Sequence, residues 1–275
     1  MASPRTVLTT GANSGIGLAT AIEVARRGFH SIGSVRSPAK AKVVRAAAAE
    51  AGVDIDTVLL DVTDVAQCEQ VVGPLELYAL VNNAGYALAG AIEDIADEEA
   101  RHLLDTMVLA PMRLARLALP SMRAHGGGRI VNVSSIAGLV STPLGGWYTA
   151  AKHALEALSD SLRVETAKDG VKVVLVEPGG FDTGIWEEFQ RDIDRHADRG
   201  SRYTGAYSRF LQAQRLAAPI MGSPSQCASV IAGAIESGSP RSRYLVGLDA
   251  QAINLTSRLT PSFVQDRFLR LVLDL

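Results

Sequence analysis

The first two-thirds of the chain alternates short apolar runs with segments whose apolar residues recur at helical spacing. Continuous Val, Ile and Leu runs are typical of strands that are buried on both faces of a sheet. Such runs predict strands at Thr6–Thr10, Phe29–Val35, Asp56–Leu60, Leu77–Val81, Arg129–Ser134 and Val171–Val176. Helical spacing predicts helices at Ser14–Arg27, Pro38–Ala51, Glu98–Met122 and Tyr148–Lys168. Repeated strand–helix units favour an α/β fold with a doubly wound parallel sheet and helices on both faces.

After Pro178 the pattern changes, because the segment Gly184–Ala218 is rich in Arg, Asp and Tyr and ends near Pro219. We interpret this segment as helices that lie over the edge of the sheet. A helix, a short strand and a helical tail follow, at Pro224–Ser237, Arg243–Gly247 and Asp249–Leu275. No internal repeat or linker separates these parts, so we expect one domain over residues 1–275.

Composition narrows the class of protein. The 275 residues are 47% hydrophobic and 20% charged, which supplies a core and excludes a disordered chain. The formal net charge of −2 argues against a nucleic-acid binder that relies on bulk positive charge. No apolar run approaches the roughly 18 residues of a membrane span. We therefore expect neither a nucleic-acid nor a membrane partner.

Cysteine and histidine usage bears on compartment and metal chemistry. The two cysteines, Cys68 and Cys227, cannot form a disulfide framework. Met1–Arg5 leads straight into a strand-like run, so we expect no signal peptide. A reducing, cytoplasmic setting is therefore expected. The five histidines are scattered without the spacing of metal ligands, so no metal site is predicted.

A glycine-rich turn follows the first strand and opens the first helix. Gly11, Gly15 and Gly17 have a G-x3-G-x-G spacing, which differs from the usual G-x-G-x-x-G dinucleotide fingerprint. Glycines there permit a tight turn, and the helix N-terminus offers free N–H groups to a pyrophosphate. The alternative is a strand–helix turn without a ligand. The position of this turn in the first strand–helix unit favours a dinucleotide-binding role.

Further motifs occur in register along the chain. Asp61 follows the third strand, Asn82–Gly85 follows the fourth, and a Tyr-x3-Lys pair begins at Tyr148. Together with Thr10–Gly17, these motifs resemble the short-chain dehydrogenases/reductases, in order and with the spacing of that family. The resemblance covers about residues 6–183. It implies a Rossmann-like, doubly wound parallel sheet of about seven strands, which agrees with the pattern of elements.

The end of the second strand distinguishes the two nicotinamide cofactors. An acid about 20 residues after the glycine turn binds the ribose 2′-OH of NAD, whereas an Arg favours the 2′-phosphate of NADP. Ser34–Ser37 holds no acid and contains Arg36, whose forked donors suit a phosphate. We therefore predict NADP as the cofactor, with its 2′-phosphate bound by Arg36, Ser37 and Asn13. The alternative is that Arg36 is an ordinary solvated charge.

The resemblance implies contacts for the rest of the cofactor. It assigns the pyrophosphate turn to Gly11, Ser14, Gly15, Ile16 and Gly17. It assigns the adenine to Asp61 and Val62, the nicotinamide ribose to Asn83, Ala84, Gly85, Tyr148 and Lys152, and the nicotinamide to Pro178, Gly179, Phe181 and Thr183. Most of these positions follow the carboxyl ends of strands, where open α/β sheets bind ligands.

The candidate catalytic pair is Tyr148 and Lys152, which share one face of a predicted helix because four residues separate them. Hydride reduction of a carbonyl needs a proton for the forming alkoxide, and a phenol with a pKa near 10 is a poor partner at neutral pH. We expect the Lys152 ammonium to lower the Tyr148 pKa, as a cationic nicotinamide also would. By resemblance, Ser135 binds the substrate carbonyl. Tyr148 is thus the predicted acid/base, Lys152 its activator and Ser135 the oxyanion stabiliser.

One position departs from the family pattern. The family places an Asn in the long helix before the catalytic strand, where it organises a water next to the Lys. Met107 occupies this position in the stretch Asp105–Pro111, so the relay keeps a main-chain carbonyl and loses an amide. The alternative is that Met107 simply fills space. We expect a slow or substrate-restricted enzyme.

Loops beyond the strand ends are expected to form the substrate pocket, with residues 184–218 as a lid. The predicted lining is mostly apolar: Leu88, Ile136, Leu139, Leu144, Trp147, Gly180, Phe181, Ile185, Trp186 and Phe189. As a set, this lining suggests a bulky hydrophobic alcohol or ketone, whereas each residue alone is as well explained by packing. The resemblance also implies a homo-oligomer, a dimer or tetramer, that associates through Glu98–Met122 and Tyr148–Lys168.

The leading hypothesis is an NADP(H)-dependent oxidoreductase that interconverts a ketone or aldehyde and an alcohol. A second hypothesis is a non-catalytic dinucleotide sensor or scaffold, which Met107 favours and the set of Ser135, Tyr148 and Lys152 disfavours. A third is an epimerase or dehydratase of related fold, which Arg36 and the length of 275 residues disfavour. The sequence contains no G-x-S-x-G motif, so a serine hydrolase finds no support.

Overall fold

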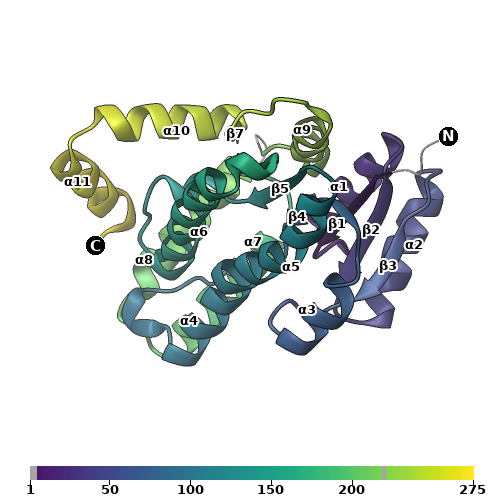
Figure 1. The fold of residues 1–275 in the computed structure, drawn as a ribbon. Helices are drawn as coiled ribbons and strands as arrows, with labels where there is room; N and C mark the ends of the chain where they lie inside the picture. The colour runs from purple at the N-terminus through teal and green to yellow at the C-terminus, as the bar shows by residue number, and fades with distance from the viewer. Residues whose placement is uncertain (1–4, 219–220) are drawn as a thin grey trace.

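Seven parallel strands form one sheet in the order β3-β2-β1-β4-β5-β6-β7 (Figure 1). A computed structural model describes residues 5–218 and 221–275. Met1–Pro4, where no signal peptide was expected, and Pro219, near which the charged segment was expected to end, lie outside the described residues. The strands are β1 Thr6–Thr10, β2 His30–Val35, β3 Asp56–Leu59, β4 Leu77–Asn82, β5 Gly128–Val133, β6 Val171–Pro178 and β7 Arg243–Val246. This sheet confirms the predicted α/β class, with every strand within two residues of its expected bounds.

Helices cover both faces of the sheet. One face carries α1 (Gly15–Arg26), α2 (Pro38–Glu50) and α9 (Pro224–Glu236), and the other carries α3 (Val65–Val72), α5 (Ala110–Ala124) and α6 (Gly146–Glu165). The α3 helix occupies the short crossover between β3 and β4, where we predicted no helix. Successive strand side chains point to opposite faces, so Val7 joins the core beneath α9 and Leu8 joins the core beneath α5.

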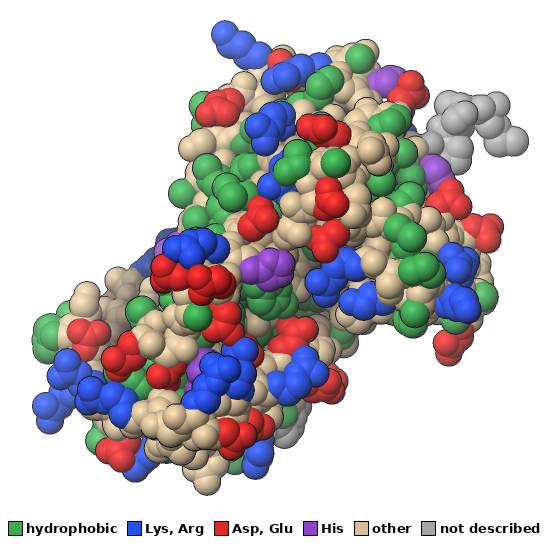
Figure 2. All heavy atoms as spheres, turned by 90° about the horizontal axis from the view of Figure 1, so that it is seen from below, with side chains coloured by type: hydrophobic (Ala, Val, Ile, Leu, Met, Phe, Trp, Pro, Cys, Tyr) green, Lys and Arg blue, Asp and Glu red, His purple; other side chains and the backbone are tan. Residues whose placement is uncertain are grey.

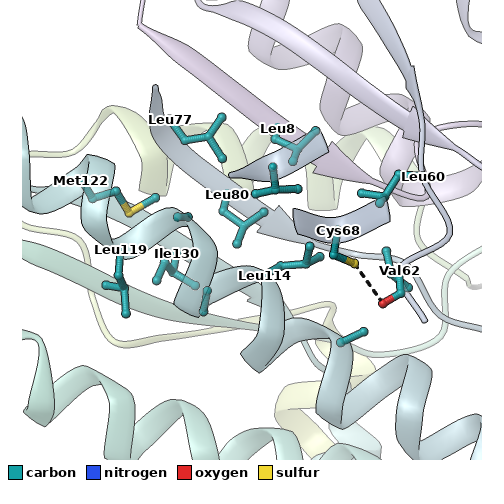
Figure 3. Close-up of a cluster of buried hydrophobic side chains, with 14 of the residues drawn as sticks. Leu8, Leu60, Val62, Cys68, Leu77, Leu80, Leu114, Leu119, Met122 and Ile130 are labelled. Atoms are coloured by element: carbon teal, nitrogen blue, oxygen red, sulfur yellow. Dashed lines mark hydrogen bonds between the residues drawn. The ribbon is translucent and has the colours of Figure 1, made fainter. Parts of the chain in front are cut away.

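The core beneath α3 and α5 is rich in leucine (Figure 3). Leu80 from the sheet and Leu114 from α5 are almost fully buried in it. Cys68 of α3 points into the same core, and its Sγ lies 3.4 Å from the carbonyl oxygen of Val62. Both cysteines are free and buried. Burial raises the pKa of the Cys68 thiol and raises that of Cys227 to about 12.

The helix predicted at Glu98–Met122 is interrupted. It begins as α4 (Asp97–Leu104), passes through a π-helical turn, η2 (Asp105–Leu109), and continues as α5. The reason lies in Pro111, which has no N–H to donate to the carbonyl of Met107 four residues earlier. Such π turns are frequent at functional sites, because they redirect side chains and carbonyls within a helix.

The last third of the chain adds helices at the β7 edge and over the carboxyl ends of the strands. These are α7 (Ile185–Asp198), α8 (Thr204–Ala217), α10 (Leu248–Leu259) and α11 (Ser262–Leu273). Figure 1 shows α10 and α11 extending away from the sheet. An ion pair between Arg209 of α8 and Asp274 holds the C-terminus beside α8. Acidic and basic side chains are interspersed over the face in Figure 2. Within residues 5–218 and 221–275, no helix has the length and hydropathy needed to cross a membrane.

Candidate active site

A cavity of about 800 Å³ opens at the carboxyl ends of the strands, where the strand order reverses between β1 and β4. It extends from the glycine-rich turn past the ends of β2 and β4 to the start of α6 and to α7. All three predicted catalytic residues line it: Ser135, Tyr148 and Lys152. The predicted cofactor residues that also line it are Gly11, Asn13, Ser14, Gly15, Ile16, Arg36, Asp61, Val62, Asn83, Ala84, Gly85, Pro178, Gly179, Phe181 and Thr183. The structure therefore brings most of the predicted site together.

The glycine-rich turn has the backbone that a phosphate cradle needs. Gly11 and Gly15 have φ angles of 66° and 52°, which glycine adopts without strain. Ser14 precedes α1 without capping it through its side chain, so the first N–H groups of the helix face the cavity. A dinucleotide pyrophosphate fits this donor set.

Gly17 does not line the cavity, although we predicted it as a cofactor residue. A Cβ at this position would collide with the Asn83 amide nitrogen and the carbonyl oxygen of Gly11. Asn83 in turn donates to the carbonyl oxygen of Thr10 at 2.9 Å. The absence of a side chain at Gly17 therefore allows α1 to pack closely against the loop after β4.

Thr10 joins the two loops that border the cavity, a role that sequence analysis missed. Its hydroxyl accepts hydrogen bonds from the backbone N–H groups of Asn83 and Ala84, each at 3.0 Å. The same hydroxyl donates to the carbonyl of Val81 at 3.3 Å. The glycine turn and the Asn-Asn-Ala-Gly loop are thus held in one fixed geometry.

At the end of β2, Arg36 is exposed and borders the cavity. Burial disfavours the charged form of Asp61, but hydrogen bonds from Thr63 and the charge of Arg36 outweigh it and hold the Asp61 pKa below its usual value. Ser37 does not line the cavity, because its hydroxyl caps α2 by accepting from the N–H of Lys40 at 3.4 Å. Lys40, which we did not single out, borders the cavity and adds a second cation.

The three predicted catalytic residues approach each other from β5 and α6. Lys152 Nζ donates to the carbonyl oxygen of Val133 at 2.8 Å and lies 5.7 Å from the centre of the Tyr148 ring. The Ser135 hydroxyl accepts from the N–H of Ala137 at 3.1 Å and lies 3.5 Å from the carbonyl oxygen of Pro178. Main-chain contacts therefore fix Ser135 and Lys152 beside the phenol.

The acidity of Tyr148 differs from the sequence-based expectation. Burial raises the Tyr148 pKa to about 12, and the neighbouring Ser135 hydroxyl only partly opposes this effect. Burial also lowers the Lys152 pKa to about 8, against the charge of Glu156. We expected the Lys152 ammonium to lower the phenol pKa, but in the protein without cofactor it is desolvated and hydrogen-bonded to Val133. The phenol is therefore protonated at neutral pH.

Met107 borders the cavity from the π-helical turn. It is 2% exposed, and its side chain packs 3.5 Å from the position that a Cβ of Gly85 would occupy. The site thus has a thioether where the family pattern places an amide. Because Pro111 has no N–H, the carbonyl of Met107 lacks its usual helical donor.

The predicted substrate lining is found in part. The cavity is bordered by Ile136, Gly180, Phe181, Ile185, Trp186 and Phe189, but not by Leu88, Leu139, Leu144 or Trp147. Leu88 and Trp147 pack around Met107 instead, and Leu144 packs with Phe189. The same wall includes polar groups that we did not anticipate, namely Tyr86, Glu187, Glu188, Arg191 and Asp249.

The α7–α8 segment is attached to the loop after β4 by side chains. The backbone N–H of Ala87 donates to Glu188 at 3.1 Å, and that of Ala89 donates to Asp192 at 3.1 Å. A third donor, the N–H of Ala91, reaches the Tyr207 hydroxyl at 2.8 Å. Alternate residues of an extended segment thus find their hydrogen-bond acceptors on α7 and α8.

The model of the family described as short chain dehydrogenase matches residues 5–194. The chain belongs to this family. Among its relatives, the oxidoreductase YusZ of Bacillus subtilis (strain 168) is 37% identical over 230 residues, which cover 82% of each chain. Retinol dehydrogenase 7 of Mus musculus is 32% identical over 285 residues, covering 96% of this chain and 87% of the relative.

The fold of this short-chain dehydrogenase is also found in solved structures. A structure of actinorhodin polyketide ketoreductase with NADPH is similar, with a TM-score of 0.75 and 26% sequence identity. The likeness covers 89% of this chain and 96% of the ketoreductase. These comparisons confirm the Rossmann-like fold and identify this short-chain dehydrogenase as an oxidoreductase.

Proposed function

We propose that this short-chain dehydrogenase is an NADP(H)-dependent oxidoreductase that interconverts a ketone or aldehyde and an alcohol. The observation that carries the proposal is a single cavity bordered by the glycine turn, Arg36, Ser135, Tyr148 and Lys152. A dinucleotide site beside an acid/base pair is the arrangement that carbonyl reduction by hydride requires.

The residues that would hold the cofactor follow the cavity wall. The first N–H groups of α1 would bind the pyrophosphate, and Arg36 would bind the 2′-phosphate with Lys40 beside it. Asp61 and Val62 would face the adenine, while Lys152 would bind the nicotinamide ribose. The reduced cofactor supplies a hydride when bound.

Tyr148 would supply the proton that the substrate oxygen needs. Because its pKa is about 12, the phenol holds its proton at neutral pH, which is the form required for reduction. Ser135 would donate a hydrogen bond to the same oxygen and orient the carbonyl. The ammonium of Lys152 would stabilise the phenolate that remains, since an adjacent cation favours the charged form.

The substrate is proposed to be bulky and largely apolar. Ile136, Ile185, Trp186 and Phe189 supply an apolar wall, and Glu188 adds a polar group to it. Mouse retinol dehydrogenase, similar in sequence, is named for a substrate of this kind. We propose that residues 184–218 form the lid of this pocket, within a single domain over residues 1–275.

A substrate panel tests the function. The rate of NADPH consumption is measured by absorbance with a panel of aliphatic, cyclic and aromatic ketones. For at least one bulky apolar ketone, this rate should exceed the rate measured with NADH. Tyr148→Phe should retain NADPH binding and lose turnover by at least about 100-fold, since a positioned acid contributes that much. Binding of NADPH without turnover of any ketone would instead favour the non-catalytic sensor or scaffold.

A further inference from the structure

A row of ionisable side chains continues along α6 beyond Lys152. Glu156 and Asp160 follow at intervals of four residues, so the three side chains lie along one side of the helix. Glu156 is 6% exposed, and Glu177, near the end of β6, is fully buried. Sequence analysis missed both glutamates, because each is surrounded by apolar residues along the chain.

The guanidinium of Arg243 contacts the carboxyl groups of Glu156, Asp160 and Glu177. Arg243 of β7 donates through Nη2 to Glu156 at 3.2 Å and to Asp160 at 2.6 Å, and its Nε lies 3.1 Å from Glu177 Oε1. Within the described part of the chain, neither oxygen of Glu177 accepts a hydrogen bond, and Oε1 of Glu156 accepts none. Because ionised carboxylates buried without donors are costly, Glu156 and Glu177 do not both carry a full charge.

Glu156 and Glu177 titrate as a pair. Burial and then the charge of Glu156 raise the Glu177 pKa to about 7, with Arg243 opposing them. Burial also raises the Glu156 pKa, against the Ser134 hydroxyl and Arg243. The charge of Glu156 favours the protonated form of Glu177, so Glu177 takes the proton of the pair as pH falls through about 7.

Glu156 connects this pair to the candidate catalytic site. It lies one helical turn from Lys152, and its charge is the one that opposes the desolvation of the Lys152 ammonium. Glu156 also packs with the buried Ser134 against Gly138, where a Cβ would meet both side chains. Ser134 directly precedes Ser135, which follows β5. Glu156 therefore adjoins the predicted catalytic positions both after β5 and on α6.

We propose that Glu156 and Glu177 are positioning residues for Lys152. The charge on Glu156 keeps the Lys152 ammonium protonated, and Glu177 leaves Glu156 ionised by taking the proton of the pair. Asp160 and Arg243 complete the set of charged groups that face the pair. The mechanistic role rests on the proposed function, in which Lys152 stabilises the phenolate of Tyr148, whereas the coupling of charges is a property of the protein without cofactor.

A lysine titration tests the coupling without turnover. The chain contains five lysines (Lys40, Lys42, Lys152, Lys168 and Lys172), so NMR of protein labelled with 13C at lysine Cε resolves each one. The spectrum of Lys152→Met assigns the Lys152 signal, whose midpoint is expected at about pH 8 in the wild type. Glu156→Gln should lower this midpoint by about one unit, because the compensating charge is lost. Glu177→Gln should shift it little, because Glu156 keeps its charge in this variant.

The direction of the shift separates the proposed role from a loosened structure, which would hydrate Lys152 and raise its midpoint toward 10.5. Asp160→Asn is the matched control, since its carboxyl group is partly exposed and binds the same guanidinium, and it should shift the midpoint little. A midpoint that does not fall in Glu156→Gln, or that falls as far in Glu177→Gln, overturns the proposal. If Glu177→Gln does not fold, Glu177→Met removes the same carboxyl group and leaves an apolar side chain in the strand.

The alkaline limb of kcat/KM for NADPH-dependent reduction supplies a second readout. It should move to lower pH in Glu156→Gln and stay near its wild-type position in Glu177→Gln, in step with the Lys152 midpoint. A limb that does not follow the midpoint overturns the positioning role. An inactive wild-type protein contradicts the proposed function, while a lowered Lys152 midpoint in Glu156→Gln would still support the coupling of charges.

Discussion

The carboxylate of Glu188 accepts a hydrogen bond from the backbone N–H of Ala87 at 3.1 Å, across 101 residues of sequence. Ala87 is 2% exposed, so water does not replace this acceptor readily. One turn further along α7, the carboxylate of Asp192 accepts a hydrogen bond from the N–H of Ala89. Arg195 forms ion pairs with Asp192 at 3.1 Å and with Glu99 of α4 at 2.7 Å. The loop after β4 is therefore fixed to α7 by two carboxylates, of which Glu188 borders the cavity.

Removal of the Glu188 acceptor should loosen this wall. We expect Glu188→Ala to destabilise the protein by about 1–3 kcal/mol, the cost of an unpaired buried N–H, and to raise KM more than it lowers kcat. Urea denaturation and steady-state kinetics measure the two effects. Glu188→Gln keeps a carbonyl acceptor and should behave like the wild type. Equal behaviour of the Ala and Gln variants would contradict the role of this hydrogen bond.

Arg36 should determine the preference for NADPH. We expect Arg36→Ala to weaken NADPH binding by roughly tenfold or more, because a charge-assisted contact to phosphate is lost, and to leave NADH binding nearly unchanged. Fluorescence titration of the two reduced cofactors measures both. Arg36→Lys should fall between them, because an ammonium lacks the forked donors. A similar loss of affinity for both cofactors would show that Arg36 does not bind the 2′-phosphate.

The buried Lys152 should make stability depend on pH. Burial lowers its pKa from 10.5 to about 8 in the folded protein, so the unfolded chain binds the proton more tightly. Lys152 should therefore contribute a gain in stability with rising pH between about 8 and 10.5, by at most about 1.4 kcal/mol per unit, and this gain is lost as pH falls through 8. Buried Tyr148 and Cys227, whose pKa values are raised to about 12, contribute a slope of the opposite sign, so the contribution of Lys152 is the difference between variants. Urea midpoints across this range should lose the contribution in Lys152→Met and keep it in the exposed-site control Lys168→Met. The same pH dependence in Lys152→Met and the wild type would contradict the assignment.

Met107 should tolerate an apolar substitution better than the family residue. We expect Met107→Asn to destabilise the protein by about 1–3 kcal/mol, because the amide enters an apolar cluster that offers it no designed partner. Met107→Leu, which conserves volume, should cost less than about 1.5 kcal/mol. Thermal denaturation compares the two variants. Higher turnover in Met107→Asn would show that the missing amide limits the rate, whereas greater stability would contradict the packing argument.

Local pattern was sufficient for the sheet and for the residues that adjoin strand ends. Buried strands such as Val171–Pro178 are almost continuously apolar, and glycines mark the turn before α1. The π turn at Met107 was not predictable from periodicity, because one missing N–H at Pro111 alters a helix whose apolar spacing remains intact. The acceptors for Ala87 and the proton partner of Glu156 lie far away in sequence, so only the folded chain brings these groups together.

Both native thiols are shielded, and this has a practical consequence. Cys68 and Cys227 are fully buried, and burial raises the pKa of each, so neither presents a reactive thiolate at neutral pH. A cysteine introduced on the exposed side of α7, for example at Asp194, which does not line the cavity, would then be the site of selective labelling by a maleimide dye. Fluorescence from that position would report movement of α7 when cofactor or ketone is added, without prior replacement of the native cysteines.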